Sequence, residues 1–160
     1  MAEFTDRAFD VLVRASSNAR APNARTRSLT SMACALENTD CRAEHVDRAL
    51  LVALEAVRLP EPSVPLLSAA LRLGGAVLRV ADTVDAKAAV AVQELVRKTC
   101  DLADGSANAK VRWNACHVLG LVGRLSDERL LWRTLLSLER ALKTSSNVKV
   151  CIAAGRSLAS

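Results

Sequence analysis

The stretch that decides the fold is residues 110–120, with the sequence KVRWNACHVLG. It aligns without a gap with residues 149–159, KVCIAAGRSLA, which lie 39 residues further along the chain. Weaker copies lie 46 and 83 residues upstream, at Pro65, Ala69, Ala70, Leu73 and Gly74 for the first and at Arg27, Ala33 and Leu36 for the second. Four copies in 160 residues indicate an array of structural repeats.

The motif has the residue types of a helix that packs against two neighbours. One apolar stripe follows helical spacing through Val111, Ala115, Val118, Leu119 and Val122, and a second contains Trp113, Cys116 and Gly120. In a repeat array, such a helix packs on its own partner helix and on the next repeat. The small residues of the motif allow the helix backbones to approach closely.

Helical periodicity extends over nearly the whole chain, and breaks rich in Pro, Gly and small capping residues interrupt it. The pattern predicts helices over residues 2–16, 24–38, 42–58, 61–80, 85–103, 107–123, 126–143 and 146–159. We expect one all-α array of four helix pairs, with repeats at residues 2–38, 42–80, 85–123 and 126–159. The composition agrees, because Ala, Leu and Val dominate and a β-fold would use more aromatic and β-branched residues.

The segment at residues 110–120 resembles the second helix of a HEAT repeat, and HEAT repeats form one of the armadillo-like families. The general pattern covers nearly the whole chain, and the resemblance is most specific over residues 105–160. It implies an α-α superhelix (a HEAT-like solenoid) that serves as a scaffold, with the second helix of each pair on the concave face. It implies no catalytic residues.

Charge is distributed unevenly between the predicted helices. The first helices of the four pairs are balanced. The second helices carry a net charge of +7 and the connecting segments carry −2, which gives the +5 of the whole chain. Against Glu37 and Glu61, the second helices hold Arg25, Arg27, Arg72, Arg79, Lys110, Arg112, Arg124, Lys149 and Arg156. The alternatives are a positive concave face that attracts acidic partners and an ordinary solvated surface.

A basic ladder across the repeats is the most specific prediction about function. Arg27, Lys110 and Lys149 share one motif column, and His117 and Arg156 share another, together with Cys34. On the second helix of the third pair, the exposed side should contain Lys110, Asn114, His117, Leu121 and Arg124. We therefore expect Arg27, Lys110, Asn114, His117, Arg124, Lys149 and Arg156 to bind the partner.

The cysteines and histidines are weak candidates for metal binding or catalysis. Cys34, Cys41 and His45 lie near one helix start, but a fourth ligand and a Cys-x-x-Cys knuckle are missing from the sequence around them. Cys116 and His117 are adjacent in a helix and point about 100° apart, so they cannot hydrogen bond to each other as a nucleophile and its base. We expect no metal, no cofactor and no catalysis, and five reduced thiols that pack as small apolar groups.

The predicted function is that of a protein-binding scaffold whose concave face docks an acidic or amphipathic peptide. Binding to the backbone of a nucleic-acid duplex is the alternative, although the chain has no Tyr and little Phe for base stacking. Trp113 and Trp132 are interpreted as packing residues, since each lies in an apolar helical stripe.

The location and the assembly state are expectations of the same kind. The chain has no apolar run long enough to span a membrane, and its widely spaced cysteines favour the cytoplasm or nucleus. Ile152, Ala154 and Leu158 are expected to need cover at the last helix, which favours either a fragment of a longer array or a homodimer through an uncapped end.

Overall fold

The computed structural model describes residues 2–17, 21–38, 41–80, 86–124 and 127–160. Within these ranges the chain forms eight α-helices and one short 3-10 helix, and it contains no strand. The helices are α1 (Ala2–Ser16), α2 (Pro22–Asn38), α3 (Ala43–Arg58), α4 (Val64–Val80), α5 (Ala86–Gly105), α6 (Ala109–Leu119), η1 (Val122–Arg124), α7 (Glu128–Thr144) and α8 (Val148–Leu158). The predicted all-α fold with four helix pairs is confirmed.

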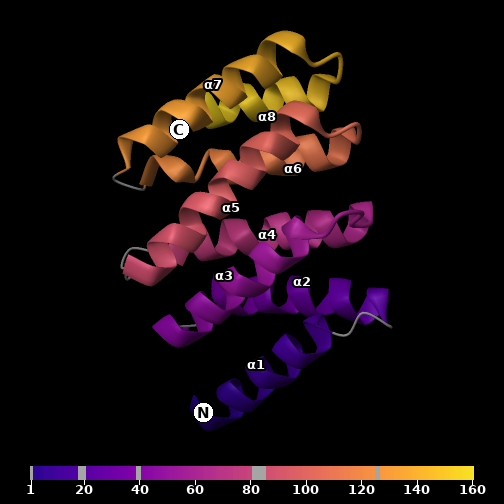
Figure 1. The fold of residues 1–160 in the computed structure, drawn as a ribbon, viewed down its shortest axis with the longest axis vertical. Helices are drawn as coiled ribbons and strands as arrows, with labels where there is room; N and C mark the ends of the chain where they lie inside the picture. The colour runs from indigo at the N-terminus through magenta and orange to yellow at the C-terminus, as the bar shows by residue number, and fades with distance from the viewer. Residues whose placement is uncertain (1, 18–20, 39–40, 81–85, 125–126) are drawn as a thin grey trace. The chain divides into compact units, whose positions relative to one another are not determined.

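The helices belong to two compact units, Met1–Ala81 and Asp82–Ser160, and each unit holds two pairs. In unit 1, α2 packs on both α1 and α4, and α3 packs on α4. In unit 2, α5 packs on α6 and α7, and α8 packs on α6 and α7. Successive helices within a unit run in opposite directions (Figure 1). The second helices of the two pairs therefore lie side by side in each unit, as the repeat pattern predicted.

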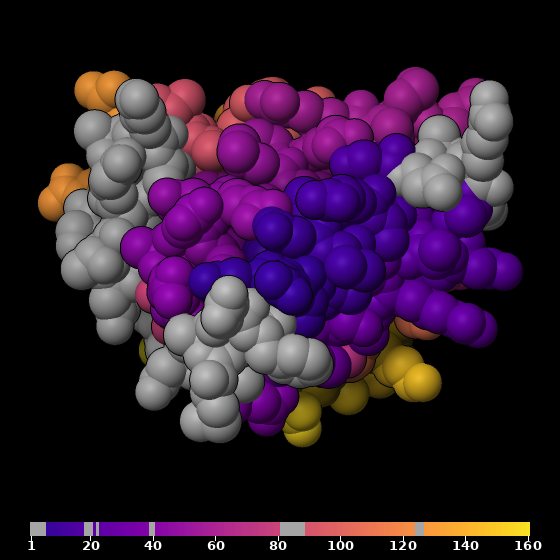
Figure 2. Space-filling view, turned by 90° about the horizontal axis from the view of Figure 1, so that it is seen from below, coloured from indigo at the N-terminus to yellow at the C-terminus, as the bar shows by residue number. Residues whose placement is uncertain are grey.

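The core of unit 1 is centred on α4, because this helix has few residues that can face water. Arg72 and Arg79 are its only charged residues, and eleven of its residues are buried. Leu71, Leu73 and Val77 are fully buried there. In the end-on view, the indigo atoms of α1 lie against the violet and purple atoms of the helices that follow (Figure 2).

The 39-residue repeat is reproduced in unit 2 at the level of single hydrogen bonds. The Asn108 side chain caps α6 by accepting from the backbone N–H groups of Lys110 and Val111, at 3.0 and 3.3 Å. The Asn147 side chain caps α8 in the same way, at 3.1 and 3.4 Å. The backbone angles of the two caps agree closely, and both helices have eleven residues. The aligned segments are therefore structural equivalents, each started by an Asn that satisfies two first-turn N–H groups.

Two of the predicted helix boundaries need correction. The second helix of the third pair, α6, ends at Leu119 rather than at residue 123, and a turn and η1 follow it. The backbone tightens there, because Leu121 N donates to Val118 O, three residues back, at 3.0 Å. Helix α4 begins at Val64 rather than at residue 61, because Pro62 disfavours helical backbone at Glu61.

Close approach of α6 and α8 depends on Gly120, at the end of α6. A Cβ atom added there would lie 2.6 Å from Ser157 Oγ, 2.8 Å from its Cβ and 3.2 Å from its Cα. Ser157 Oγ donates a hydrogen bond to Cys116 O at 2.8 Å across the same contact. A residue with any side chain at position 120 would push the two helices apart.

Polar contacts fix α7 on α5. Asp101 of α5 accepts a hydrogen bond from Arg133 at 3.1 Å. One turn further along α5, Asp104 accepts from Ser137 Oγ at 2.9 Å and forms an ion pair with Arg140. The α7 residues are spaced at helical intervals, so they form one row that faces α5. None of the helices in the described part of the chain is long and apolar enough to cross a membrane.

Candidate partner-binding site

A groove opens in unit 2 where the N-terminal ends of α6 and α8 lie side by side. Its volume is about 330 Å³, and it is lined by Ala109, Lys110, Trp113, Asn147 and Lys149. Lys110 and Lys149 reach the same groove because they are equivalent positions of the 39-residue repeat on adjacent helices. A groove of this size lies at the lower end of the range for ligand pockets, which suits a side chain or a short peptide segment.

The walls of the groove are largely apolar. Ala109 and the Trp113 ring contribute no charge, and the two lysines add methylene stems that end in ammonium groups. The side-chain oxygen of Asn147 already accepts the two hydrogen bonds that cap α8. The groove therefore combines a largely apolar lining with the positive charge of two lysines.

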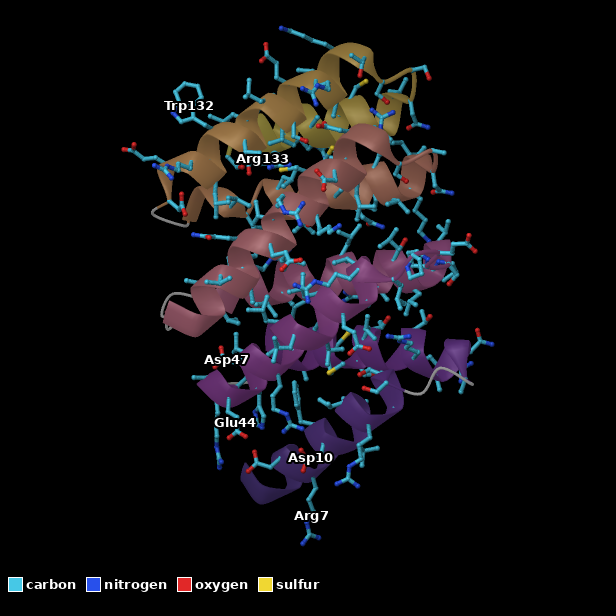
Figure 3. The ribbon with its side chains drawn as sticks, in the orientation of Figure 1. Arg7, Asp10, Glu44, Asp47, Trp132 and Arg133 are labelled. Atoms are coloured by element: carbon cyan, nitrogen blue, oxygen red, sulfur yellow. The ribbon has the colours of Figure 1, made fainter. Side chains whose placement is uncertain are left out.

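Trp113 and Trp132 are more exposed than the prediction of packing residues allowed. Trp113 is 37% exposed and contacts His117 edge to face, with ring centroids 4.6 Å apart. Trp132 is 67% exposed and projects from α7 (Figure 3). The prediction was wrong for Trp132, because the stripe that contains it is not covered: Leu135 and Leu136, one turn further on, are exposed as well. A hydrophobic stripe on a helix does not by itself identify which side a neighbour covers.

The positive charges of α6 and α8 are not compensated within the described residues. Neither helix contains Asp or Glu. Lys110, Lys149 and Arg156 are exposed, and none of them forms an ion pair with another described residue. Arg112 donates instead to the carbonyl oxygen of Ala103, at 3.0 Å. This surface is therefore open to a negatively charged ligand.

The remaining predicted residues of α6 lie along the same side. His117 is exposed and Asn114 is half-buried, whereas Val111, Ala115 and Val118 are buried. His117 and Arg156 occupy equivalent repeat positions seven residues beyond the two lysines. Seven residues correspond to a rise of roughly 10 Å, so they form a second level of the same surface. The side chain of Arg124 lies outside the described residues.

In unit 1, by contrast, three of the four predicted basic residues already form ion pairs. Arg25 pairs with Glu55 at 3.2 Å and is itself nearly buried. Arg72 and Arg79 both pair with Glu37, at 2.9 and 3.4 Å, and the hydrogen bond to Glu37 raises the pKa of Arg72. Arg27 is exposed. Glu37 is already included in the count of +7, so only the pair of Arg25 with Glu55 of α3 lowers the charge of unit 1 below that count.

A second hollow in unit 2 lies between α5 and α7 and has a different chemistry. Its volume is about 430 Å³, and it is lined by Val90, Gln93, Glu94, Arg97, Leu130 and Arg133. Its charges are already paired, since Arg97 lies 3.8 Å from both Glu94 and Asp101, and Arg133 lies 3.1 Å from Asp101. A charged ligand would have to displace these contacts.

The side chains considered for zinc binding have protein partners in unit 1. His45 is buried, stacks on Phe9 and lies 3.0 Å from Asp6. Cys34 Sγ accepts from Arg72 at 3.4 Å. Among the described residues, no group of three or more His, Cys, Asp or Glu side chains is placed to hold a metal ion.

All five cysteines are free thiols. Cys100 and Cys116 are buried, and burial raises the pKa of both thiols, to about 11 for Cys116. Cys116 is buried while the adjacent His117 is exposed, so the two side chains lie on different sides of α6. A buried thiol with a raised pKa is a poor nucleophile.

The last helix is better covered than its sequence indicated. Ala154, expected to need cover, is fully buried, and Leu158 is half-buried, whereas Ile152 is 50% exposed. The reason is that α8 packs on both α6 and α7.

Ala109 and Asn147 are groove residues that the sequence alone did not single out. Asn147 could have been found from the repeat, because it stands 39 residues after Asn108, immediately before the aligned lysines. Comparison with family models and with curated proteins found no match to this chain.

Proposed function

We propose that the chain is a non-catalytic, HEAT-like scaffold that binds a protein partner through the surface of α6 and α8, defined by Lys110, Trp113, His117, Lys149 and Arg156. The observation that carries the proposal is the groove between the two helices, which is lined by the exposed Trp113 and by two lysines that form no ion pair with another described residue. We further propose the cytoplasm or nucleus as its location, because five free thiols suit a reducing compartment.

The partner is proposed to be acidic or amphipathic. Neither α6 nor α8 contributes an acidic residue, so a negatively charged segment meets no repulsion from these helices. The exposed Trp113 ring offers apolar and aromatic contact area, which is typical of residues that dominate protein interfaces.

Binding to a nucleic-acid duplex is the rival function, since unpaired cations also attract phosphates. Two features favour the protein partner. The N–H groups of Lys110, Val111, Lys149 and Val150, which could bind phosphate at the helix starts, are already occupied by Asn108 and Asn147. The lining of the groove is also largely apolar.

The test is a titration of the protein with a short labelled polyglutamate peptide and with a labelled DNA duplex at the same ionic strength. The peptide is expected to bind more tightly. Reversing Lys110→Glu and Lys149→Glu together should weaken peptide binding by about tenfold, because each reversal replaces an attraction of roughly 0.2–1 kcal/mol by a repulsion. Circular dichroism should be unchanged, because both lysines are exposed.

Arg14→Glu with Arg129→Glu is the matched control, because both arginines are exposed and the change in net charge is the same. The control variant should bind the peptide as the wild type does. Arg27→Glu alone measures whether the predicted ladder includes unit 1. Tighter binding of the duplex than of the peptide, or wild-type affinity in the Lys110 and Lys149 variant, would overturn the proposal.

A further inference from the structure

We infer that the groove selects acidic segments that carry one large apolar side chain between their carboxylates, with that side chain inserted against Trp113. This inference rests on the proposed function and adds the chemistry of the partner to it. It is carried by the composition of the lining: Ala109 and Trp113 contribute uncharged surface, and each of the two helices that line the groove contributes one lysine.

The apolar anchor follows from the uncharged part of the lining, Ala109 and Trp113. A purely acidic chain would satisfy the two ammonium groups, but it would leave the Trp113 ring and Ala109 in contact with water or with carboxylates. Burying an apolar side chain removes its surface and that of the ring from water together. Aromatic rings gain further from edge-to-face or offset contacts with another ring. A segment with such an anchor therefore binds more tightly than one with charge alone.

The position of the carboxylates follows from the positions of the lysines. Lys110 is on α6 and Lys149 is on α8, and both line the groove that holds the anchor. One carboxylate on each side of the apolar residue can then approach one ammonium group. Neither lysine is used by another described residue, so an ion pair with the partner breaks no existing pair.

The chain offers a specific optical probe for this contact. Trp113 and Trp132 are the only tryptophans, and the sequence has no Tyr. In a Trp132→Phe variant, the emission therefore reports on Trp113 alone. Trp132 is 67% exposed and does not line the groove, so its replacement should leave the groove intact.

The experiment titrates the Trp132→Phe protein with two synthetic peptides, Glu-Glu-Phe-Glu-Glu and Glu-Glu-Ser-Glu-Glu. We expect the Phe peptide to bind about tenfold more tightly, as partial burial of one large apolar side chain supplies. It should also shift the Trp113 emission to shorter wavelength. Equal affinities of the two peptides would overturn the inference of an apolar anchor.

Three variants of the otherwise wild-type chain, titrated with labelled peptides, separate this inference from the proposed function. Trp113→Ala should abolish the advantage of the Phe peptide while the Ser peptide keeps its affinity, and Trp132→Ala, the same change outside the groove, should alter neither. Lys110→Glu with Lys149→Glu should weaken both peptides. A preference for Phe that survives in Trp113→Ala would place the anchor elsewhere and overturn the inference, whereas wild-type binding of both peptides after the lysine reversal would overturn the proposed function.

Discussion

Replacing Gly120 by Ala should destabilise unit 2 through one steric contact. The new Cβ would lie 2.6 Å from Ser157 Oγ and 3.2 Å from the Ser157 Cα, which belongs to the backbone of α8. The backbone at Gly120 has ordinary right-handed helical angles, φ −62° and ψ −16°, which Ala adopts without strain. The expected effect therefore comes from the contact between the helices and not from the conformation of residue 120.

The magnitude follows from opposing contributions. Overpacking of this kind costs about 1–3 kcal/mol. Ala also restricts the unfolded chain, which stabilises the folded state by about 0.4–1 kcal/mol. We expect a net loss of about 1–2 kcal/mol in the free energy of unfolding, which lowers the urea midpoint by roughly 1 M for a small unit.

The assay is urea unfolding followed by tryptophan fluorescence, because both tryptophans lie in unit 2 and report on its unfolding. Gly105→Ala is the matched control, since a Cβ there would meet no atom within 4 Å. It should be neutral or slightly stabilising. Gly120→Ala should cost less in a Ser157→Gly background than in the wild type, because Ser157→Gly removes the two side-chain atoms nearest the new Cβ. Equal midpoints for Gly120→Ala and Gly105→Ala would refute the steric argument.

Three further predictions concern unit 2 and the thiols. Asn108→Ala and Asn147→Ala should each lower the free energy of unfolding by about 1 kcal/mol in urea titrations, because each removes an equivalent helix cap; a neutral effect of either change would contradict its role as a cap. Burial raises the pKa of Cys116 in the folded state from 9.0 to about 11. Between these pH values the unfolded chain therefore binds fewer protons than the folded chain. The stability that the buried neutral thiol contributes is complete below pH 9 and is lost as the pH rises towards 11. Cys116→Ala should therefore lose less stability than the wild type between pH 9 and pH 11 in urea titrations, and identical losses would contradict this. EDTA should leave the melting temperature by circular dichroism unchanged, and a fall of several degrees would show that Cys34, Cys41 or His45 takes part in metal binding.

The helical fold was predictable because each helix carries its own apolar pattern and because the pattern repeats. The equivalence of Lys110 and Lys149 came from the same alignment, and the structure places both lysines in one groove. Local sequence was sufficient here, since helix starts and repeat positions depend on residues a few places apart.

The features that the sequence missed depend on contacts between distant residues. The ion pairs of Arg25, Arg72 and Arg79 join residues 30 to 42 positions apart in the chain, so counting charges by helix could not detect them. The close approach of Gly120 to Ser157 of α8 joins residues 37 positions apart, and the exposure of Trp132 depends on which face of α7 its neighbours cover. In each case the missing information was the identity of the neighbour.

The row of contacts between α5 and α7 has a mechanical consequence for the groove. Apolar surfaces tolerate sliding, but these polar contacts do not. A shift of α7 along α5 by one turn would separate Arg133 from Asp101, and it would also separate both Ser137 and Arg140 from Asp104. Because α8 packs on α7, the axial position of α8, and with it the height of Lys149 relative to Lys110, is fixed partly by carboxylates of α5. The spacing of the two lysines is thus set in part by Asp101 and Asp104, which do not line the groove.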